Sequence, residues 1–248
     1  MRSNLLQVNP SKTEVLWSSS SRRQNQITTS RVRIGSTYVL PFTSVRDIGL
    51  YIDCDVSLQT HVTVTVRSCF AALRQIRSVQ RCLPRYALLS LIRALVVSKV
   101  DYCCSVLAGV SRQLLYRLQS ILNAAARLVF SVRRPELITP LPLLRELHWL
   151  RVPERITFRL CILTHRCLNG SAPAYLAENI RLTADVERRR HLRSSTTTTL
   201  VVPPVQRSTL GDRAFPVAAP RAWNSLPPSL RTVSIQTPAE DISIRPQF

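Results

Sequence analysis

Apolar residues recur at helical spacing throughout the middle of this chain. Between residues 57 and 81 they stand about one helical turn apart, at Val62, Val66, Phe70, Leu73 and Ile76. A helix that is apolar on one face only must bury that face against another element. The spacing therefore predicts an amphipathic helix here, although VTVTV at its start (62–66) has a local β preference.

Two more helices are predicted directly after the first. Pro84, a favoured first-turn residue, begins the second, which stops at Gly109 and turns inward Leu88, Ile92, Leu95, Val96 and Leu107. Ser111 is placed to cap the third, whose buried face would hold Leu114, Leu118, Ile121, Leu122, Ala125 and Leu128. Segments 143–150 and 153–170 continue the helical pattern, which predicts a small bundle.

The two ends of the chain have a different composition. Segment 15–52 is rich in Val, Ile and Tyr and predicts two or three antiparallel strands. Beyond residue 186 proline, serine and threonine are frequent, and short strands are expected near 198–202 and 213–218. The expected fold class is α+β, predominantly α. We expect three segments, residues 1–56, 57–185 and 186–248.

The charge of the chain is strongly one-sided. It has 34 Lys+Arg against 14 Asp+Glu, a formal net charge of +20 at pH 7, and segment 57–130 holds ten basic residues against one acid, Asp101. Such a surplus predicts an anionic partner, either nucleic acid or an acidic membrane surface. Only Lys12 and Lys99 are lysines. The preference for arginine is equally consistent with phosphate binding and with GC-rich coding.

Four arginines of the first predicted helix share one side of it. At 3.6 residues per turn they fall within about 80° of one another. We call this set the arginine stripe: Arg67, Arg74, Arg77 and Arg81. A stripe of this kind can follow the phosphates of a nucleic acid without reading its bases.

Cysteine content and hydropathy bear on the compartment. Seven cysteines, an odd number without regular spacing, favour unpaired thiols in a reducing environment, and no apolar signal segment follows Met1. The longest apolar run, Ala87–Val97, is interrupted by Arg93. It is also shorter than the roughly 20 residues that span a bilayer. We expect an intracellular protein of the nucleus or cytoplasm, neither secreted nor inserted in a membrane.

Seven strings follow one another along most of the chain. They are VNPSKTEVLW (8–17), VRDIGLYIDCDVSLQTHV (45–62), SKVDYCCSVLAG (98–109), LQSILNAAARLVF (118–130), LLRELHWLRVPERI (143–156), CLNGSAPAYL (167–176) and GDRAFPVAAPRAWNSLPPSLR (211–231). In this order they resemble the C-terminal part of the reverse transcriptase of LINE-type (non-LTR) retrotransposons, in the lineage of the chicken-repeat-1, L2 and jockey elements. The chain departs from the family in having Ile48 where Leu is usual, and again from Thr232 onward.

The resemblance implies a palm remnant over 1–56, a helical thumb with connecting helices over 57–185, and a tail. The hairpin called the primer grip would comprise Val45, Arg46, Asp47, Ile48, Gly49 and Leu50. Lys12 matches the lysine that approaches the triphosphate and protonates the leaving pyrophosphate. The parent enzymes hold two Mg²⁺ ions on carboxylates, one motif being Tyr-x-Asp-Asp, and these 248 residues contain no such motif.

Three sets of residues also have plainer interpretations. Without the resemblance, Lys12 reads as a solvated lysine at a strand start. Asp53 and Asp55 invite a metal site but are more typical of turns and caps. The third set is Cys161, His165 and Cys167, whose spacing is compatible with zinc ligation. These residues stand in an apolar periodic helix, however, which favours core packing. We expect this chain to bind no metal or other cofactor, Mg²⁺ belonging by resemblance to the parent enzyme.

The expected function is that of a truncated piece of an RNA-directed DNA polymerase that lacks the catalytic aspartates. Derived from an enzyme, it would be inactive alone and would bind RNA, DNA or an RNA–DNA hybrid independently of sequence. No membrane partner and no small-molecule substrate are expected. Two alternatives remain open: a domesticated nucleic-acid-binding module without enzymatic activity, and a non-functional translated relic.

Overall fold

The structure is a computed structural model that describes residues 9, 12–19, 21–35, 37–131, 140–185, 199–206 and 208–231. The chain divides into two compact units, residues 1–156 and 157–248, and each is described by itself.

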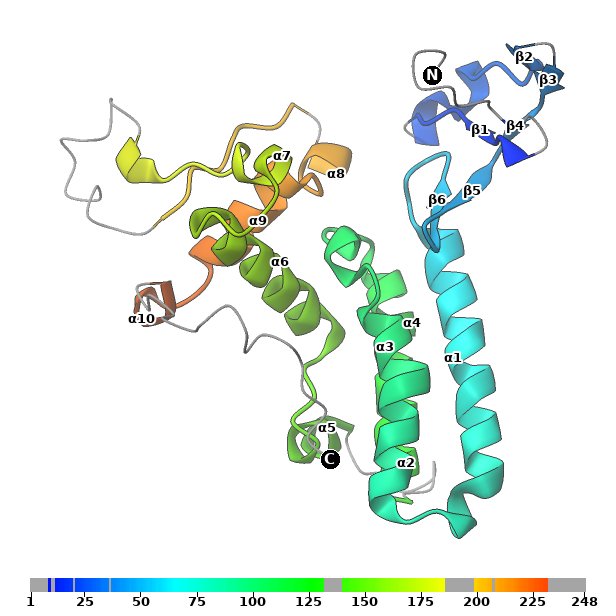
Figure 1. Ribbon diagram of the computed structural model, residues 1–248, viewed down its shortest axis with the longest axis vertical. Helices are drawn as coiled ribbons and strands as arrows, with labels where there is room; N and C mark the ends of the chain where they lie inside the picture. The colour runs from blue at the N-terminus through cyan, green and yellow to red at the C-terminus, as the bar shows by residue number, and fades with distance from the viewer. Residues whose placement is uncertain are drawn as a thin grey trace. The chain divides into compact units, whose positions relative to one another are not determined.

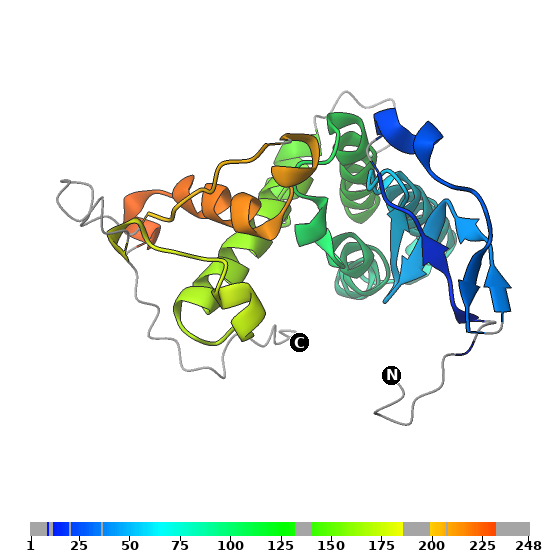
Figure 2. The ribbon, with the colours of Figure 1, turned by 90° about the horizontal axis from the view of Figure 1, so that it is seen from above.

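Helices dominate the first unit. They are α1 (Gln59–Val79), α2 (Arg85–Ile92), α3 (Ser98–Asp101), α4 (Arg112–Val129) and α5 (Pro140–Glu146). Helices α1 and α4 pack against each other in the same direction, and the α2–α3 segment runs back the opposite way to join the end of α1 to the start of α4 (Figures 1 and 2). All six residues predicted to face inward on α4 are buried, and α4 contributes Leu118, Ile121 and Leu122 to the most deeply buried part of the core.

The starts of the helices show what local sequence can specify. Helix α4 begins directly after Ser111, as predicted, but the Ser111 hydroxyl forms no capping hydrogen bond. On α1, Val62, Leu73 and Ile76 are buried as predicted, whereas Val66 and Phe70 are only half-buried. Viewed around the helix axis, the middle of the predicted face is therefore buried, and Phe70 lies at the edge of that face.

The second predicted helix is interrupted by a π-turn, η5 (Arg93–Val97), between α2 and α3. A π-turn holds more residues than an α-turn, so it shifts the side of the helix that faces the core. Val96 and Val97 are buried, but Leu95, which was predicted to face inward, is 42% exposed, and that prediction was wrong. The carbonyl of Val96 accepts a contact from the buried Cys69 thiol of α1 at 3.8 Å.

This second helix also ends earlier than predicted. Cys103 takes the left-handed conformation with φ of 53° after α3. A 3-10 turn, η6 (Cys104–Leu107), then follows before Gly109. Cys104 and Leu107 are nevertheless buried, so this turn still contributes to the core.

The described residues between 15 and 53 form six short strands in three separate two-stranded sheets. The strands are β1 (Val15–Leu16), β2 (Val32–Ile34), β3 (Thr37–Val39), β4 (Pro41–Phe42), β5 (Ser44–Asp47) and β6 (Leu50–Asp53). Pairs β2–β3 and β5–β6 are antiparallel, but β1 and β4 pair in parallel. The expectation of two or three antiparallel strands was therefore wrong in number and in part in direction. Gly35, at φ of 62°, and Pro41, which lacks an N–H, divide the apolar run into short pieces.

Among its described residues, the second unit contains the rest of α6 (Val152–Leu168) and five short elements. These are α7 (Ala174–Ala177), η7 (Thr183–Asp185), α8 (Ser208–Gly211), α9 (Phe215–Asn224) and α10 (Pro228–Arg231). The strand expected near 213–218 is wrong, because α9 covers most of that stretch. Pro216 occupies its first turn, where proline is favoured, and Ala218, Ala219 and Ala222 favour a helix.

Near 198–202 the described residues hold an isolated bridge between Leu182 and Leu200 rather than the expected strand, and residue 198 lies outside the described part. The Asn224 side chain replaces a neighbouring strand there. Its amide oxygen accepts from the Leu200 N–H at 2.9 Å, and its NH₂ donates to the Leu200 carbonyl at 2.9 Å. Helix α9 thus holds the extended segment by a pair of side-chain hydrogen bonds.

The described residues are mostly helical with a few small sheets, which confirms an α+β, predominantly α fold. The three expected segments stay a prediction, since the two compact units meet inside α6 and not near 57 or 186. No helix in the described part of the chain combines the length and the apolar character needed to cross a membrane.

A matched pair of leucine substitutions tests the π-turn. Leu88 is 4% exposed and Leu95 is 42% exposed. We expect Leu88→Ala to lower the free energy of unfolding by about 2–5 kcal/mol, and Leu95→Ala to lower it by less than about 1 kcal/mol. Urea unfolding followed by circular dichroism measures both. Equal costs would mean that Leu95 faces the core and that the helix is continuous.

Candidate nucleic-acid interface

The six residues predicted as a primer grip form a tight hairpin. Strands β5 and β6 pair from Ser44–Asp53 to Asp47–Leu50, which confirms the predicted hairpin. The two residues of its turn both have positive φ, 44° at Ile48 and 83° at Gly49, as a type I′ turn requires. A β-branched residue is strained in this region, and Ile48 is also 85% exposed. The hairpin therefore presents a strained apolar tip to solvent.

Tyr102, at the end of α3, holds this tip in place. Its hydroxyl donates a hydrogen bond to the carbonyl of Ile48. The positive φ of Gly49 favours glycine, and a Cβ placed there would lie 3.3 Å from the Tyr102 ring, a tight contact. On the hairpin itself, the Arg46 guanidinium lies over the Tyr51 ring at 5.7 Å. The hairpin is thus held in two places: β6 leads into α1, and Tyr102, at the end of α3, bonds to the hairpin tip.

Asp53 and Asp55 have the turn and cap roles that their spacing favours. One Asp53 oxygen accepts from the Thr60 N–H at 3.1 Å and from the Ser57 hydroxyl at 3.2 Å, which caps α1. Asp55 accepts from the Ser57 N–H at 2.9 Å. Among the described residues no three potential ligands gather into a metal site. One oxygen of Asp53 and one of Asp55 are therefore used in the cap and the turn.

Lys12 lies before β1 in a short turn. Its side chain is exposed, and its N–H donates to the Asn9 carbonyl at 3.1 Å. The structure brings it to no other predicted site residue. A role in leaving-group chemistry stays a prediction that the resemblance alone carries.

The set with zinc-like spacing packs in the core of the second unit. Cys161 and Cys167 are each 8% exposed. Burial raises the pKa of the Cys161 thiol to about 11 and also raises the pKa of Cys167. The His165 ring forms a hydrogen bond with the side-chain amide of Asn169 at 2.8 Å. Thiols kept protonated by burial are poor metal ligands, and core packing accounts for these residues.

The arginine stripe is on the surface. Arg67, Arg74 and Arg77 lie on α1, and all four side chains are exposed. Arg81 lies just past the helix, in the 3-10 turn η4 (Gln80–Cys82), rather than on the helix as predicted. The stripe therefore follows the length of α1 and continues around its end.

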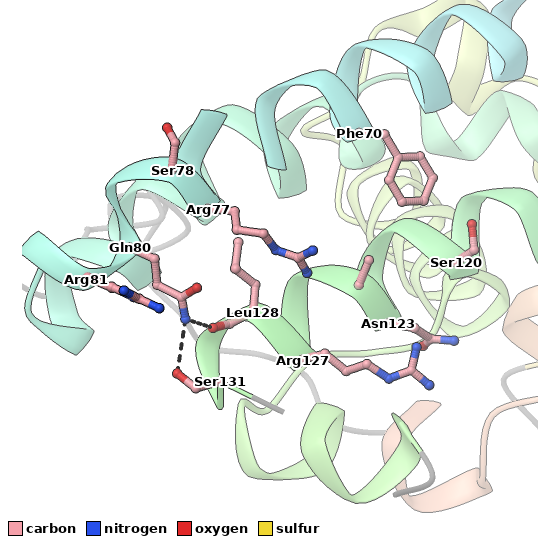
Figure 3. Close-up of a pocket in the computed structure, with 11 residues that line it drawn as sticks. Phe70, Arg77, Ser78, Gln80, Arg81, Ser120, Asn123, Arg127, Leu128 and Ser131 are labelled. Carbon is pink, nitrogen blue, oxygen red and sulfur yellow. Dashed lines mark hydrogen bonds between the residues drawn. The ribbon is translucent and has the colours of Figure 1, made fainter. Parts of the chain in front are cut away.

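A pocket of about 920 Å³ lies between α1 and α4 and takes in part of the stripe. Figure 3 shows Phe70 and Arg77 projecting from α1 toward α4, with Arg127 on the opposite wall. We call it the α1–α4 pocket. It is lined by Phe70, Arg77, Ser78, Gln80, Arg81, Ser120, Asn123, Ala124, Arg127, Leu128 and Ser131.

Side-chain hydrogen bonds tie the two walls of the pocket together. At one end the Gln80 amide donates to the Leu128 carbonyl at 2.8 Å and to the Ser131 hydroxyl at 3.0 Å (Figure 3). Toward the other end of the helix pair, Arg117 of α4 donates to the Thr63 hydroxyl of α1 at 3.1 Å. The spacing between the helices is therefore fixed on both sides of the pocket.

The local electrostatics are one-sided. Helix α1 contains no acidic residue, and no acid is found among the described residues that line the pocket. The single acid of segment 57–130, Asp101, forms a two-point ion pair with Arg155, at 2.8 and 2.9 Å. These side chains are only 24% and 12% exposed. Because Asp101 is already paired, the positive charge of the stripe is not neutralised locally.

Comparison with known proteins gave no match: neither a family model, nor a curated protein, nor a solved structure is similar to this chain.

Sequence reasoning missed the α4 wall of the pocket. Asn123 and Arg127 stand four residues apart on α4, opposite its buried stripe of leucines, and Ser120 stands on the same side. Polar residues at helical spacing opposite a buried face are expected of any amphipathic helix, so this cluster alone did not indicate a pocket. What the sequence could not supply was that this side of α4 faces the arginines of α1.

A buried histidine near the start of α1, His61, should make the stability of the fold depend on pH. His61 is 5% exposed beside Asp53, and burial lowers its pKa, partly offset by the Asp53 charge. An unfolded histidine has a pKa of about 6.5, so below that pH the unfolded chain takes up a proton that the folded chain resists. The stability that neutral His61 contributes is therefore present above about pH 6.5 and is lost as the pH falls toward its lowered pKa.

We expect His61→Gln to make the free energy of unfolding depend less steeply on pH between roughly 5 and 6.5. Urea unfolding at a series of pH values measures the slope. The control is His148→Gln, since His148 is exposed. An unchanged slope in the His61 variant would contradict the assignment.

Proposed function

We propose that the helical bundle of this chain is a thumb-like module that holds RNA, DNA or an RNA–DNA hybrid by its phosphates, as the resemblance to LINE-type reverse transcriptases implies. The observation that carries the proposal is the arginine stripe, whose four side chains are exposed and have no acid on the same helix. Guanidinium groups match phosphate oxygens in charge and geometry. Contacts of this kind set the position of a nucleic acid and do not select its sequence.

The hairpin supports the same function at the other end of α1. Its strained tip at Ile48 is fixed by Tyr102 and projects into solvent. Backbone strain that a structure maintains is found mainly at sites of function. In the proposed module this tip lies against the terminus of a nucleic-acid strand while the arginine stripe holds the strand behind it.

Polymerase chemistry is not proposed for this chain by itself. The 248 residues contain no adjacent pair of aspartates, and Asp53 and Asp55 are used as cap and turn. Without a pair of metal ions there is no group to activate a primer hydroxyl in the manner of the parent enzymes. The proposed role is binding.

Neutralising part of the stripe should weaken binding in a salt-dependent way. For Arg67→Gln combined with Arg74→Gln we expect lower affinity for a labelled RNA–DNA duplex. We also expect the slope of log affinity against log salt to fall by about 2, since each phosphate contact contributes about 0.9. Fluorescence anisotropy at several salt concentrations measures both. The control, Arg166→Gln with Arg181→Gln, removes the same charge from exposed positions in the second unit.

Equal losses in the two double variants would reduce the effect to net charge and would contradict a role for the stripe. Binding of the unmodified chain that did not weaken with salt would contradict phosphate contacts altogether.

A primer-extension assay tests the absence of catalysis. With an RNA template, a DNA primer, all four nucleotides and Mg²⁺, we expect this chain to give no extended product, because it has no aspartate pair to hold the metals. An active reverse transcriptase on the same template is the positive control. Template-directed extension by the chain would refute the proposal that it acts by binding alone.

A further inference from the structure

We infer that the α1–α4 pocket binds one unpaired nucleotide of a single-stranded nucleic acid, with its phosphate on the guanidinium groups and its base against Phe70. This inference rests on the proposed nucleic-acid binding and specifies a second mode of it. The exposed stripe can hold a duplex from outside, whereas the pocket requires a base that is free to enter.

The size of the pocket is the first argument. Its volume of about 920 Å³ is far more than a lone phosphate needs. It lies within the roughly 300–1,000 Å³ of pockets that hold small organic molecules. In a duplex the bases are paired and stacked inside, so only an unpaired nucleotide can place a base in such a pocket.

The guanidinium groups are the second argument. Arg77, Arg81 and Arg127 all line the pocket, and within the described part of the chain none of them forms an ion pair. The Nε atom of Arg127 is buried and has no hydrogen-bond partner among the described residues. A buried donor without a partner is uncommon and calls for an acceptor. A phosphate group in the pocket would supply one.

Asn123 is the third argument, because its amide is held in one orientation. The Val152 N–H donates to Gln119 at 2.9 Å, and the Gln119 NH₂ donates to the Asn123 carbonyl oxygen at 2.9 Å. This relay uses the acceptor of Asn123 and leaves its NH₂ without a partner among the described residues. The NH₂ can therefore donate to a carbonyl or a ring nitrogen of a base.

Phe70 completes the set. Its ring projects from α1 into the pocket and is half-buried (Figure 3). In the described part of the chain the two arginine–aromatic stacks involve other rings, Tyr51 and Phe130. Phe70 is thus an aromatic side chain of the pocket lining that no arginine stacks on among the described residues, and we assign it to the base. Stacking of this kind is tolerant of base identity, so the pocket should accept several bases.

The test uses the full chain and a short labelled single-stranded DNA of mixed sequence. Phe70→Leu keeps an apolar side chain but removes the ring, and we expect it to weaken single-strand binding by roughly 5- to 150-fold. Phe70→Tyr, which keeps the ring, should bind within about twofold of the unmodified chain. Asn123→Ala, a half-buried position, is a second pocket variant that should also weaken binding.

Three competitors identify the part of the ligand that is bound. A nucleoside 5′-monophosphate should displace the single strand at lower concentration than either the nucleoside or inorganic phosphate, because only it has both parts. Competition by inorganic phosphate as strong as that by the nucleotide would overturn the inference, as would single-strand binding unaffected by Phe70→Leu and by Asn123→Ala.

The duplex measurement separates this inference from the proposed function. If the Phe70 and Asn123 variants lose single-strand binding but keep duplex binding, the pocket is assigned as inferred. If the unmodified chain binds the single strand but no duplex at low salt, the duplex-binding function fails and the pocket stands. If it binds neither, both are overturned.

Discussion

The parallel packing of α1 against α4 is the arrangement on which the rest of the first unit depends. Two helices that run in the same direction need a return path about as long as themselves, at about 1.5 Å per residue. Here the α2–α3 segment is that path, and it must also bury its own apolar side. The π-turn adjusts its face so that Val96 and Val97 reach the core, while Cys69 of α1 contacts the Val96 carbonyl. The hydrogen bonds of Gln80 and Arg117 then fix the spacing of the two parallel helices.

In the helical bundle, the acidic residue Asp101 is paired with an arginine, whereas the arginines of the stripe remain exposed on the surface. The Asp101–Arg155 pair is half-buried, and one Arg155 nitrogen, Nη1, donates to both Asp101 oxygens, which offsets part of the desolvation cost of the pair. Successive arginines of the stripe are seven, three and four residues apart. Those three or four apart repel one another at a cost of about 0.2–0.5 kcal/mol per pair, which solvent exposure and salt reduce. The bundle therefore tolerates a basic face at modest cost, and that face remains open to an anionic partner.

Much of the bundle could be predicted, because its evidence is local. The strict period of α4 predicted six inward-facing residues between Leu114 and Leu128, and all six are buried, although it did not single out the buried Ala126. Leu95 was misplaced because a π-turn arises from packing against α1 and has no signature in its own sequence. The parallel pairing of β1 with β4 joins residues about 26 positions apart and is equally invisible to local patterns. In the tail a strand was expected near 213–218, but Pro216 lies in the first turn of helix α9, where proline is compatible with a helix.

The candidate site, like the fold, has parts that local sequence could predict and parts that it could not. The hairpin and the arginine stripe could be predicted, because each is a short continuous pattern. The α1–α4 pocket could not, since its two walls come from segments about 50 residues apart, as Gln80 and Ser131 illustrate. Neither wall is informative alone: Phe70 reads as a core residue and Arg127 as a solvated charge. Only the fold shows that Phe70 and Arg127 line opposite walls of one pocket.

The connection between hairpin and helix has a consequence for how a nucleic acid would lie. Asp53 both ends β6 and caps α1, so the hairpin continues directly into the helix that carries the stripe. From Arg67 to Arg77 the rise along α1 is about 15 Å, at 1.5 Å per residue. A strand of B-form DNA rises about 3.4 Å per phosphate, so this distance matches about four to five steps. Tyr102, at the end of α3, also hydrogen-bonds to the hairpin tip. Tip and stripe are therefore attached to the same helical bundle, an arrangement that suits a short stretch of strand next to its end.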